Sequence, residues 1–336
     1  MISPESAEIR EYDVPDVGEG QVKVVSENAA AKHGTEHAFL KGYGNRGGYD
    51  GETQTFRGRE GEQRPGQGPV GNMYVGRITE IGSGVEGFSE GDRVAGHGPF
   101  REVHVTQAGR LKKVPDGMDW RSAVCHDPAD FALGAVRDGN VRVGDAVALF
   151  GMGAIGLMAV QVCKLAGAEP IIAVEPVSRR REAAVQCGAD VVIDPTACDA
   201  GLEIKTSTPA PGADVCIDYS GSVHAMQAAI RAVAFGGNVV AGAFPAPYPA
   251  GLDLGAEAHI NRPNIIFSRA CSEPNREHPR WDERRILDLC WSMLADGRLS
   301  GEPIVDPIVP FEELVDAYPA IVQDPEGSVK LGASFS

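Results

Sequence analysis

An apolar run, a glycine-rich turn and an apolar helical stretch follow one another in the middle of the chain and constrain its fold most. The run Asp145–Phe150 has the length of a buried strand, and the turn Gly151-Met152-Gly153-Ala154-Ile155-Gly156 follows at once. A helical stretch continues to Leu165, and a second apolar run, Pro170–Val174, ends at the acid Glu175. This order of strand, Gly-x-Gly-x-x-Gly, helix, strand and acid predicts a βαβ unit that binds a dinucleotide.

The residues of the glycine-rich turn have separate physical roles. Gly151 permits a tight turn, Gly153 lets the backbone approach a pyrophosphate, and Gly156 lets the helix pack closely on the strand. The start of the helix, at Ala154 and Ile155, offers free N–H groups and a positive dipole end to the phosphates. A glycine-rich turn in some other α/β protein is the alternative, but the flanking strands, helix and acid favour dinucleotide binding.

The acid after the second strand predicts which dinucleotide is bound. The Glu175 carboxylate would accept hydrogen bonds from an adenosine ribose diol and repel a 2′-phosphate, so NAD is predicted rather than NADP. Arg179, Arg180 and Arg181 lie just beyond Glu175 and weaken that preference. One of these arginines would instead stack on the adenine, or all three would form a solvated helix face.

Strands and helices alternate beyond the turn, whereas the first third of the chain is mostly strands and turns. Alternation implies a parallel sheet with right-handed crossovers, and 336 residues suit two domains. The predicted fold class is therefore α/β, with a mostly-β unit before a parallel sheet. The expected helical segments are Ser122–Arg137, Ser178–Gln186, Val223–Ala234 and Glu283–Ala295; short strands are expected within residues 8–25 and at Asp190–Ile193, Val215–Tyr219, Gly237–Gly242 and Val329–Phe335.

Charge, hydropathy and cysteine content exclude several classes of protein. The net charge of −16 disfavours nucleic acid and anionic lipid surfaces as partners and suits solubility. No apolar run approaches the roughly 20 residues of a membrane span, and the first residues do not resemble a signal peptide, so a cytoplasmic protein is expected. The seven cysteines are an odd number and contain no Cys-x-x-Cys, which disfavours a disulfide framework.

Residues 42–71 form a glycine-rich segment, with ten glycines among thirty positions. Such a long loop is typically functional or mobile. It is either a lid whose arginines face an oxygen-rich substrate or a solvated surface loop. Its arginines and aromatic residues are Arg46, Arg57, Arg59, Arg64, Tyr43, Tyr49 and Phe56.

The chain resembles the medium-chain dehydrogenase/reductase superfamily, which includes zinc alcohol, sorbitol and threonine dehydrogenases. The resemblance rests on the order of the units and on the motifs Gly18–Val24, Ile81–Val85, Gly91–Val94, Val143–Asp145 and Asp218–Gly221, together with Lys330. It implies a GroES-like catalytic domain, residues 1–135 and 269–336, split around a Rossmann domain, residues 136–268. It also implies an active site in the cleft between the domains and a homo-oligomer, either a dimer or a tetramer.

The same resemblance implies further cofactor contacts. Ser220, Gly221 and the turn at Gly242 would line the nicotinamide side of the cleft. Arg180 stands where members of the superfamily often place a basic residue against the adenine.

The chain departs from the superfamily where zinc members hold their catalytic metal. Their Cys-Gly-Ser/Thr-Asp is replaced by His33-Gly34-Thr35-Glu36, their Gly-His-Glu by Gly71-Asn72-Met73, and their Glu-Pro by Asp127-Pro128. Asn72 is a poor zinc ligand, and catalytic zinc generally needs three protein ligands. We therefore expect no catalytic metal; the alternative is a third ligand from His37 or His97 beside His33 and Asp127.

Without zinc, a positioned side chain must take the hydroxyl proton of an alcohol substrate. His33 is the favoured base or acid, with Asp127 orienting it, and Thr35 matches the proton-relay hydroxyl of the zinc enzymes. Lys32 and His37 are weaker candidates. A lone histidine or aspartate is more often structural than catalytic, which is the alternative for each of these residues.

The predicted function is transfer of a hydride between a secondary alcohol and NAD, the alcohol being a small-molecule polyol, sugar or cyclitol. A zinc-free reductase of the quinone or enoyl type is one alternative. A non-catalytic NAD-binding protein on the same fold is the other.

Overall fold

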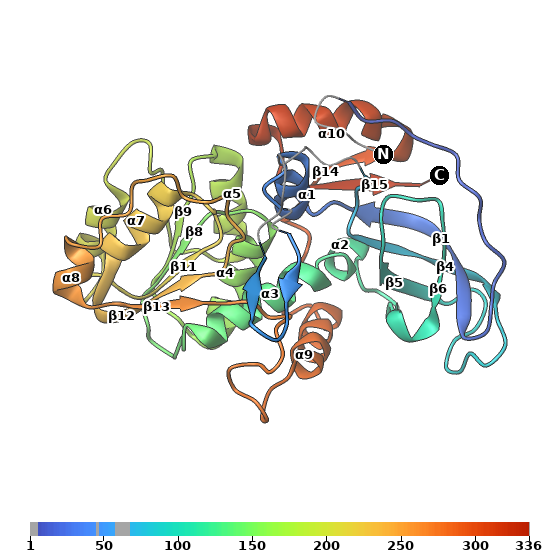
Figure 1. Cartoon of the computed structure of the whole chain (residues 1–336), viewed down its shortest axis with the longest axis horizontal. Helices are drawn as coiled ribbons and strands as arrows, with labels where there is room; N and C mark the ends of the chain where they lie inside the picture. Colours follow the sequence, from blue (N-terminus) through green and yellow to red (C-terminus); the bar gives the residue numbers. More distant parts are fainter. Residues whose placement is uncertain (1–5, 45–46, 58–67, 336) are drawn as a thin grey trace.

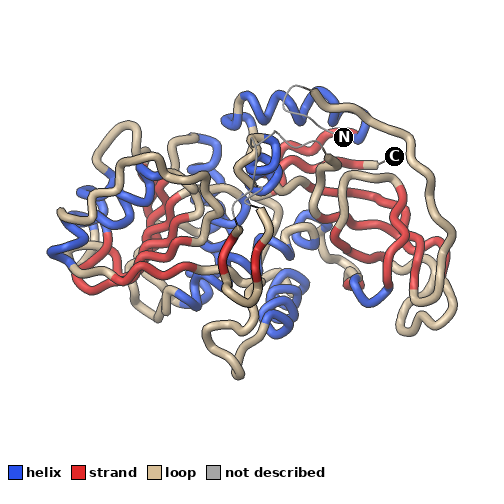
Figure 2. The backbone as a smooth tube through the Cα atoms, viewed as in Figure 1, coloured by secondary structure: helices blue, strands red, loops and turns tan. Residues whose placement is uncertain are grey.

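Two sheets lie side by side, each with its own helices (Figures 1 and 2). The computed structural model describes residues 6–44, 47–57 and 68–335. One sheet has seven strands and the other six, and a two-stranded hairpin stands apart from both. No helix among the described residues is long and apolar enough to cross a membrane.

The first sheet is mostly antiparallel and joins the two ends of the chain. Strand β1 pairs with β4, β6 and β15, and the strand order is β14-β15-β1-β4-β5-β7. The pairing of β14 with β15 is parallel. The strands are β1 (Gln21–Ala30), β4 (Met73–Ile81), β5 (Arg93–His97), β6 (Val103–Gln107), β7 (Lys112–Lys113), β14 (Val305–Pro310) and β15 (Lys330–Ser334).

The second sheet is parallel, in the order β10-β9-β8-β11-β12-β13. This is the doubly wound order of dinucleotide-binding folds, with the first strand next to the fourth. The strands are β8 (Val147–Phe150), β9 (Ile171–Val174), β10 (Val191–Ile193), β11 (Ala213–Asp218), β12 (Val233–Ala241) and β13 (Asn264–Phe267). The predicted fold class, a GroES-like unit with a Rossmann sheet, is confirmed.

Helices cover both faces of the parallel sheet, because its strands alternate apolar residues between two cores. Leu149 packs on the side of α3 and α4, whereas Ala148 and Phe150 pack on the side of α6 and α7. The helices are α1 (His33–Leu40), α2 (Trp120–Ala123), α3 (His126–Asp138), α4 (Ala154–Ala166), α5 (Ser178–Cys187), α6 (Ala200–Ser207), α7 (Val223–Ala232), α8 (Glu257–Asn261), α9 (Glu283–Ala295) and α10 (Leu314–Gln323).

Several predicted boundaries need correction. The single helix expected over Ser122–Arg137 is two helices, and its second part, α3, runs through the boundary expected at residue 135. Helix α7 ends at Ala232 because Val233 already belongs to β12. Residues 8–20 form no regular strand, and β1 begins only at Gln21.

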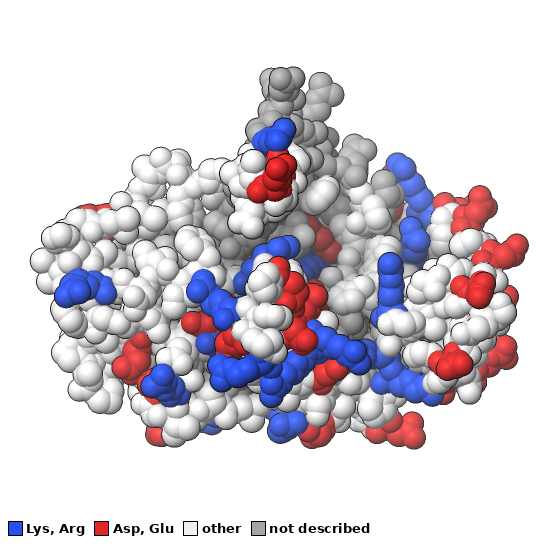
Figure 3. Space-filling model, turned by 60° about the horizontal axis from the view of Figure 1, so that its bottom comes forward, with Lys and Arg blue, Asp and Glu red and all other residues white. Residues whose placement is uncertain are grey.

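The glycine-rich segment contains a short hairpin of β2 (Tyr49–Asp50) and β3 (Thr55–Phe56). Tyr49 and Phe56 are exposed and pack edge to face with ring centroids 5.2 Å apart, and Arg57 forms an ion pair with Asp50. Three of the arginines expected to face a substrate, Arg46, Arg59 and Arg64, lie outside the described residues. On the face drawn in Figure 3, acidic and basic side chains are interspersed.

Candidate active site

The glycine-rich turn links β8 to α4 and has the shape that dinucleotide binding requires. Gly151 has φ +88°, and a Cβ there would lie 2.7 Å from the Cα of Ser220. A Cβ on Gly156 would lie 1.9 Å from the carbonyl oxygen of Gly151. A Cβ on Gly153, the N-cap of α4, would meet no described atom within 4 Å, and no side chain caps this helix. The two outer glycines therefore close the turn, while Gly153 borders open space into which the N–H groups of Ala154 and Ile155 can bind phosphate.

Glu175 is buried beside this turn, with 3% of its surface exposed. Its Oε2 accepts a 2.6 Å hydrogen bond from the Met152 N–H, and its Oε1 accepts a 3.1 Å bond from the Val177 N–H. A carboxylate oxygen can accept two hydrogen bonds, so each oxygen retains one position for a ribose hydroxyl. The residues present fit the adenosine half of a dinucleotide.

The carboxyl ends of β11 and β12 meet next to the same turn. Ser220 donates to Asp218 Oδ1 from its N–H (2.8 Å) and its hydroxyl (2.6 Å). The Gly242 N–H donates to the Asp218 carbonyl at 3.0 Å, and a Cβ on Gly242 would lie 2.5 Å from the ring of Tyr219. With Gly221, these residues form the edge of the sheet at which ligands of open α/β folds bind.

The arginines beyond Glu175 are engaged with other parts of the chain. Arg179 Nε donates to Asp306 Oδ2 at 2.6 Å, and Arg180 Nε donates to the Ser328 carbonyl at 3.0 Å. Asp306 and Ser328 belong to the returning C-terminal segment, so these contacts tie the parallel-sheet domain to the other domain. Arg181 pairs with Asp194 at 3.1 Å.

His33 begins α1 at the end of β1, and its ring is fixed by a backbone group. The Leu331 N–H donates to His33 Nε2 at 2.9 Å. Burial, with the nearby charges of Lys330 and Arg180, lowers the pKa of His33 to about 3. His33 is therefore neutral at neutral pH, and the lone pair of Nε2 is already used.

The structure corrects the expected pairing of Asp127 with His33. Asp127, at the start of α3, accepts a 2.7 Å hydrogen bond on Oδ1 from the ammonium group of Lys32. Burial acts to raise the pKa of Asp127, but Lys32 lowers it below the ordinary value, so Asp127 is anionic. Thr35 lies exposed in the first turn of α1. The neighbouring His126 faces away, bonded to the Leu287 carbonyl at 2.8 Å.

Sequence reasoning missed the role of Glu36, Tyr318 and Lys330 around this site. Glu36 accepts hydrogen bonds from the Tyr318 hydroxyl and from two backbone N–H groups. Lys330 is buried and donates to the Ala31 carbonyl, which fixes the chain just before Lys32. The only sequence signal for such a role was a lysine within the apolar strand pattern of residues 329–335.

The side chains present do not fit a catalytic zinc ion. Of the three expected ligand positions, His33 uses the lone pair of Nε2 on a backbone N–H, Asp127 is bound by an ammonium group, and Asn72 carries an amide. No group of three His, Cys, Asp or Glu side chains within residues 6–44, 47–57 and 68–335 could hold a metal ion.

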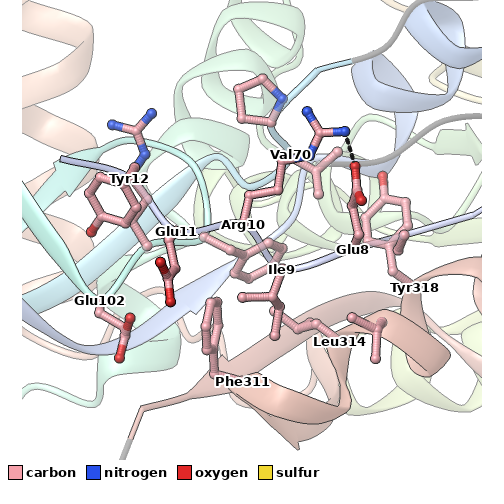
Figure 4. A pocket seen from close by; sticks show the side chains of 15 residues that line it. Glu8, Ile9, Arg10, Glu11, Tyr12, Val70, Glu102, Phe311, Leu314 and Tyr318 are labelled. Carbon is pink, nitrogen blue, oxygen red and sulfur yellow. Dashed lines mark ion pairs between the residues drawn. The ribbon is translucent and has the colours of Figure 1, made fainter.

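A cavity of about 270 Å³ lies elsewhere, between the N-terminal segment and α10 (Figure 4). Ile9, Phe311 and Leu314 supply apolar walls, and Glu8 and Arg10 form an ion pair at its rim. Tyr318 lines this cavity and also contacts the site described above. The cavity contains none of the predicted cofactor residues.

A Gly-x-Gly-x-x-Gly turn on a doubly wound sheet, joined to a mostly antiparallel domain, defines a two-domain dinucleotide-dependent oxidoreductase. A family model described as "Zinc-binding dehydrogenase" matches residues 154–278. The chain is 42% identical to "D-guloside 3-dehydrogenase" of Escherichia coli K12, over 99% of this chain and 98% of that protein. The chain belongs to the zinc-binding dehydrogenases of the medium-chain dehydrogenase/reductase superfamily, and its cofactor is a nicotinamide dinucleotide.

Two solved structures share the fold at lower identity. The 2R,3R-butanediol dehydrogenase from Bacillus subtilis has a TM-score of 0.77 and 21% identity, over 99% of this chain and 98% of that chain. A protein described as a short chain alcohol dehydrogenase from Escherichia coli CFT073, complexed with NADH, has a TM-score of 0.75 and 19% identity, over 99% of this chain and 97% of that chain. The predicted superfamily and the prediction of an enzyme are confirmed.

Proposed function

We propose that this protein is an NAD-dependent dehydrogenase that oxidises a secondary hydroxyl of a sugar or glycoside in the cytoplasm. The observation that carries the substrate class is the 42% identity to "D-guloside 3-dehydrogenase" over nearly the whole of both chains. The bound nicotinamide supplies the hydride acceptor. The residues of this chain bind and orient both molecules and move the hydroxyl proton.

The choice of NAD over NADP is supported by Glu175 and by its arginine neighbours. A 2′-phosphate would approach a buried carboxylate, which disfavours NADP. Each arginine already has a partner: Arg179 contacts Asp306, Arg180 contacts Ser328 and Arg181 contacts Asp194. Their guanidinium groups are therefore less available to a 2′-phosphate than the sequence suggested. We propose Gly151, Gly153, Ala154, Ile155, Gly156, Glu175, Ser220, Gly221 and Gly242 as the cofactor site, with Arg180 at its adenine end.

The proposed division of the chain places residues 136–268 in the cofactor domain and residues 1–135 and 269–336 in the catalytic domain, with α3 crossing the first boundary. Among the proposed catalytic residues, Thr35 is exposed in the first turn of α1, and Asp127 is an anion held by Lys32. His33 is neutral and anchors α1 to Leu331, which supports a positioning role rather than that of a base.

We also propose a homo-oligomer. Strand β13 is the outer strand of the parallel sheet, and its Phe267 and Ile265 are 75% and 42% exposed. Apolar side chains on an open sheet edge are typical of surfaces that associate. Light scattering of the purified protein would give the oligomeric state, and Phe267→Lys is expected to shift it toward the monomer.

The function is tested by following NADH formation with a panel of substrates. The panel contains alkyl glycosides of D-gulose and its epimers, free sugars, polyols, cyclitols, quinones and enoyl thioesters, each with NAD and with NADP. Turnover of a glycoside or sugar with NAD is the expected result. Turnover confined to quinones or enoyl compounds would contradict the proposal, as would NAD binding without turnover of any compound.

A further inference from the structure

The starts of α1 and α3 meet through one shielded ion pair. Lys32 Nζ lies 2.7 Å from Asp127 Oδ1, and the two side chains are 25% and 10% exposed. The ammonium group also lies 4.6 Å from the centre of the Phe131 ring. Lys32 is therefore held from two sides, and an ion pair this sheltered is stronger than a pair in open solvent.

This ion pair is linked through Phe131 to the edge of the parallel sheet where ligands of open α/β folds bind. The backbone carbonyl of Phe131 accepts a 2.7 Å hydrogen bond from the Tyr219 hydroxyl. Tyr219 directly follows β11 and precedes Ser220, at the carboxyl end of the central strands. The contacts from Lys32 to Phe131 to Tyr219 thus connect the ammonium group with the sheet edge at which we propose that the nicotinamide binds.

Asp127 and Asn72 each hold a buried polar atom without a partner among the described residues, as do Asp130 on α3 and Asp218 at the end of β11. The first two of these atoms are Asp127 Oδ2 and Asn72 Nδ2. The Asn72 N–H bonds to the Ala30 carbonyl, two residues before Lys32. One atom is an acceptor and the other a donor, which suits the hydroxyl groups of a sugar, because each hydroxyl can both donate and accept.

Building on the proposed function, we propose that the Lys32 ammonium group binds the reacting oxygen of the sugar and exchanges its proton, with Asp127 as the residue that positions it. Asp127 stands where the resemblance implies a zinc ligand, and here its partner is an ammonium group. An ammonium group offers a positive charge and three hydrogen-bond donors, so it stabilises an oxygen that gains negative charge.

The proton balance is simplest in the direction of reduction. A bound nicotinamide would supply the hydride that reaches the carbonyl carbon. As it arrives, the electron pair of the C=O π bond takes a proton from Lys32 and forms the new O–H bond. The neutral amine then takes a proton from water. Oxidation is the reverse: the ammonium group first releases a proton to water, and the amine then accepts the hydroxyl proton as the C–H hydride leaves.

The test compares Lys32→Ala and Lys32→Met with Lys112→Ala. Lys112 makes a similar ion pair with Asp288, at 2.6 Å, but on an exposed surface. Both Lys32 variants are expected to lose about 10²–10⁴-fold in kcat on the sugar that the wild type oxidises. NADH affinity, measured by fluorescence titration, should be unchanged. Small amines such as ethylamine should restore turnover to Lys32→Ala, and Lys112→Ala should behave as the wild type.

Asp127 is tested by a conservative pair of substitutions and by metal content. Asp127→Asn should lower kcat, and Asp127→Glu should recover part of it. Mass spectrometry of protein purified without chelator should find no stoichiometric zinc, and turnover should survive dialysis against a chelator.

Three results would overturn the assignment of Lys32: full turnover by Lys32→Met, a folded Lys32→Ala that binds NADH but is not restored by amines, or one zinc per chain that Asp127→Asn removes. A wild type that oxidises no sugar would instead refute the proposed function. The two failures are therefore distinguishable.

Discussion

The Tyr318 hydroxyl donates a 2.5 Å hydrogen bond to Glu36 Oε2, joining α10 to α1 across 282 positions of the chain. The other oxygen, Oε1, accepts the N–H of Lys32 at 3.1 Å and the N–H of Gly71 at 2.9 Å. Both side chains are buried. One carboxylate thus fastens three segments around the start of α1, where the proposed catalytic residues lie.

Tyr318→Phe removes one partner from this buried carboxylate. An unsatisfied buried acceptor costs about 1–3 kcal/mol, so the free energy of unfolding in urea should fall by that amount. Tyr12→Phe is the matched control, because the Tyr12 hydroxyl bonds the backbone of Val103 at the surface and its loss should matter less. An equal effect of the two substitutions would contradict the prediction.

Gly153→Ala and Gly156→Ala separate cofactor binding from folding. Gly153 has space for a methyl group and an extended backbone, so its substitution should leave the melting temperature nearly unchanged. The methyl group would occupy the space for a pyrophosphate and weaken NADH binding about tenfold or more, which is about 1.4 kcal/mol. Gly156→Ala should destabilise the fold by about 1–3 kcal/mol because its Cβ would overlap the Gly151 carbonyl.

Glu175→Ser should change the preference between cofactors. The substitution removes the carboxylate that would repel a 2′-phosphate and also the acceptor of the Met152 and Val177 N–H groups. Calorimetric titration should show weaker NAD binding and a higher ratio of NADP to NAD affinity. Glu182→Ser, an exposed site on α5, is the control. An unchanged affinity ratio in Glu175→Ser would remove Glu175 from the ribose site.

Asp130 makes the stability of the protein decrease as pH rises. Burial, with the neighbouring charge of Asp127, raises the pKa of Asp130 to about 8 from its ordinary value of 3.8. The folded state therefore keeps a proton that the unfolded state releases between pH ~4 and ~8, which reduces stability by at most about 1.4 kcal/mol per pH unit. In urea unfolding measured across this pH range, Asp130→Asn should not show this loss of stability. Asp116→Asn, a substitution at an exposed position, should show the same loss as the wild type.

His33 has the opposite effect on the acid side. Because the pKa of His33 is about 3 in the fold and 6.5 in a free histidine, the unfolded state binds the proton first as pH falls. Stability should therefore be complete above pH ~6.5 and decrease toward pH ~3. His33→Gln keeps an acceptor for the Leu331 N–H and cannot be protonated, so its acid sensitivity should be smaller. Equal acid sensitivity of the two proteins would exclude His33 as its source.

The cofactor turn was predictable because its determinants are contiguous. The run 145–175 contains the strand, the three glycines, the helix and the acid, and local backbone geometry alone places them together. Helix α9 was predicted with its observed ends, since Asp282 caps it and its apolar residues follow a helical period.

The proton-handling residues were only partly predictable. The sequence indicated His33 and Asp127 but paired them with each other. Their actual partners are the Leu331 N–H, a backbone group with no signature in the sequence, and Lys32, which lies 95 positions from Asp127. Such pairs depend on where β1, α3 and β15 converge, which is a property of the folded chain.

The pairing of β1 with β15 also bears on the order in which the protein forms during synthesis. Ala30 lies opposite Gly332, so the end of β1 gains its β15 partner only after residue 332 has left the ribosome, although its pairing with β4 and β6 can form earlier. The six parallel strands are complete by Phe267 and can assemble earlier. The catalytic half would therefore wait for its final strand beside an already folded cofactor half, exposing an open edge that chaperones or aggregation could reach in the interval.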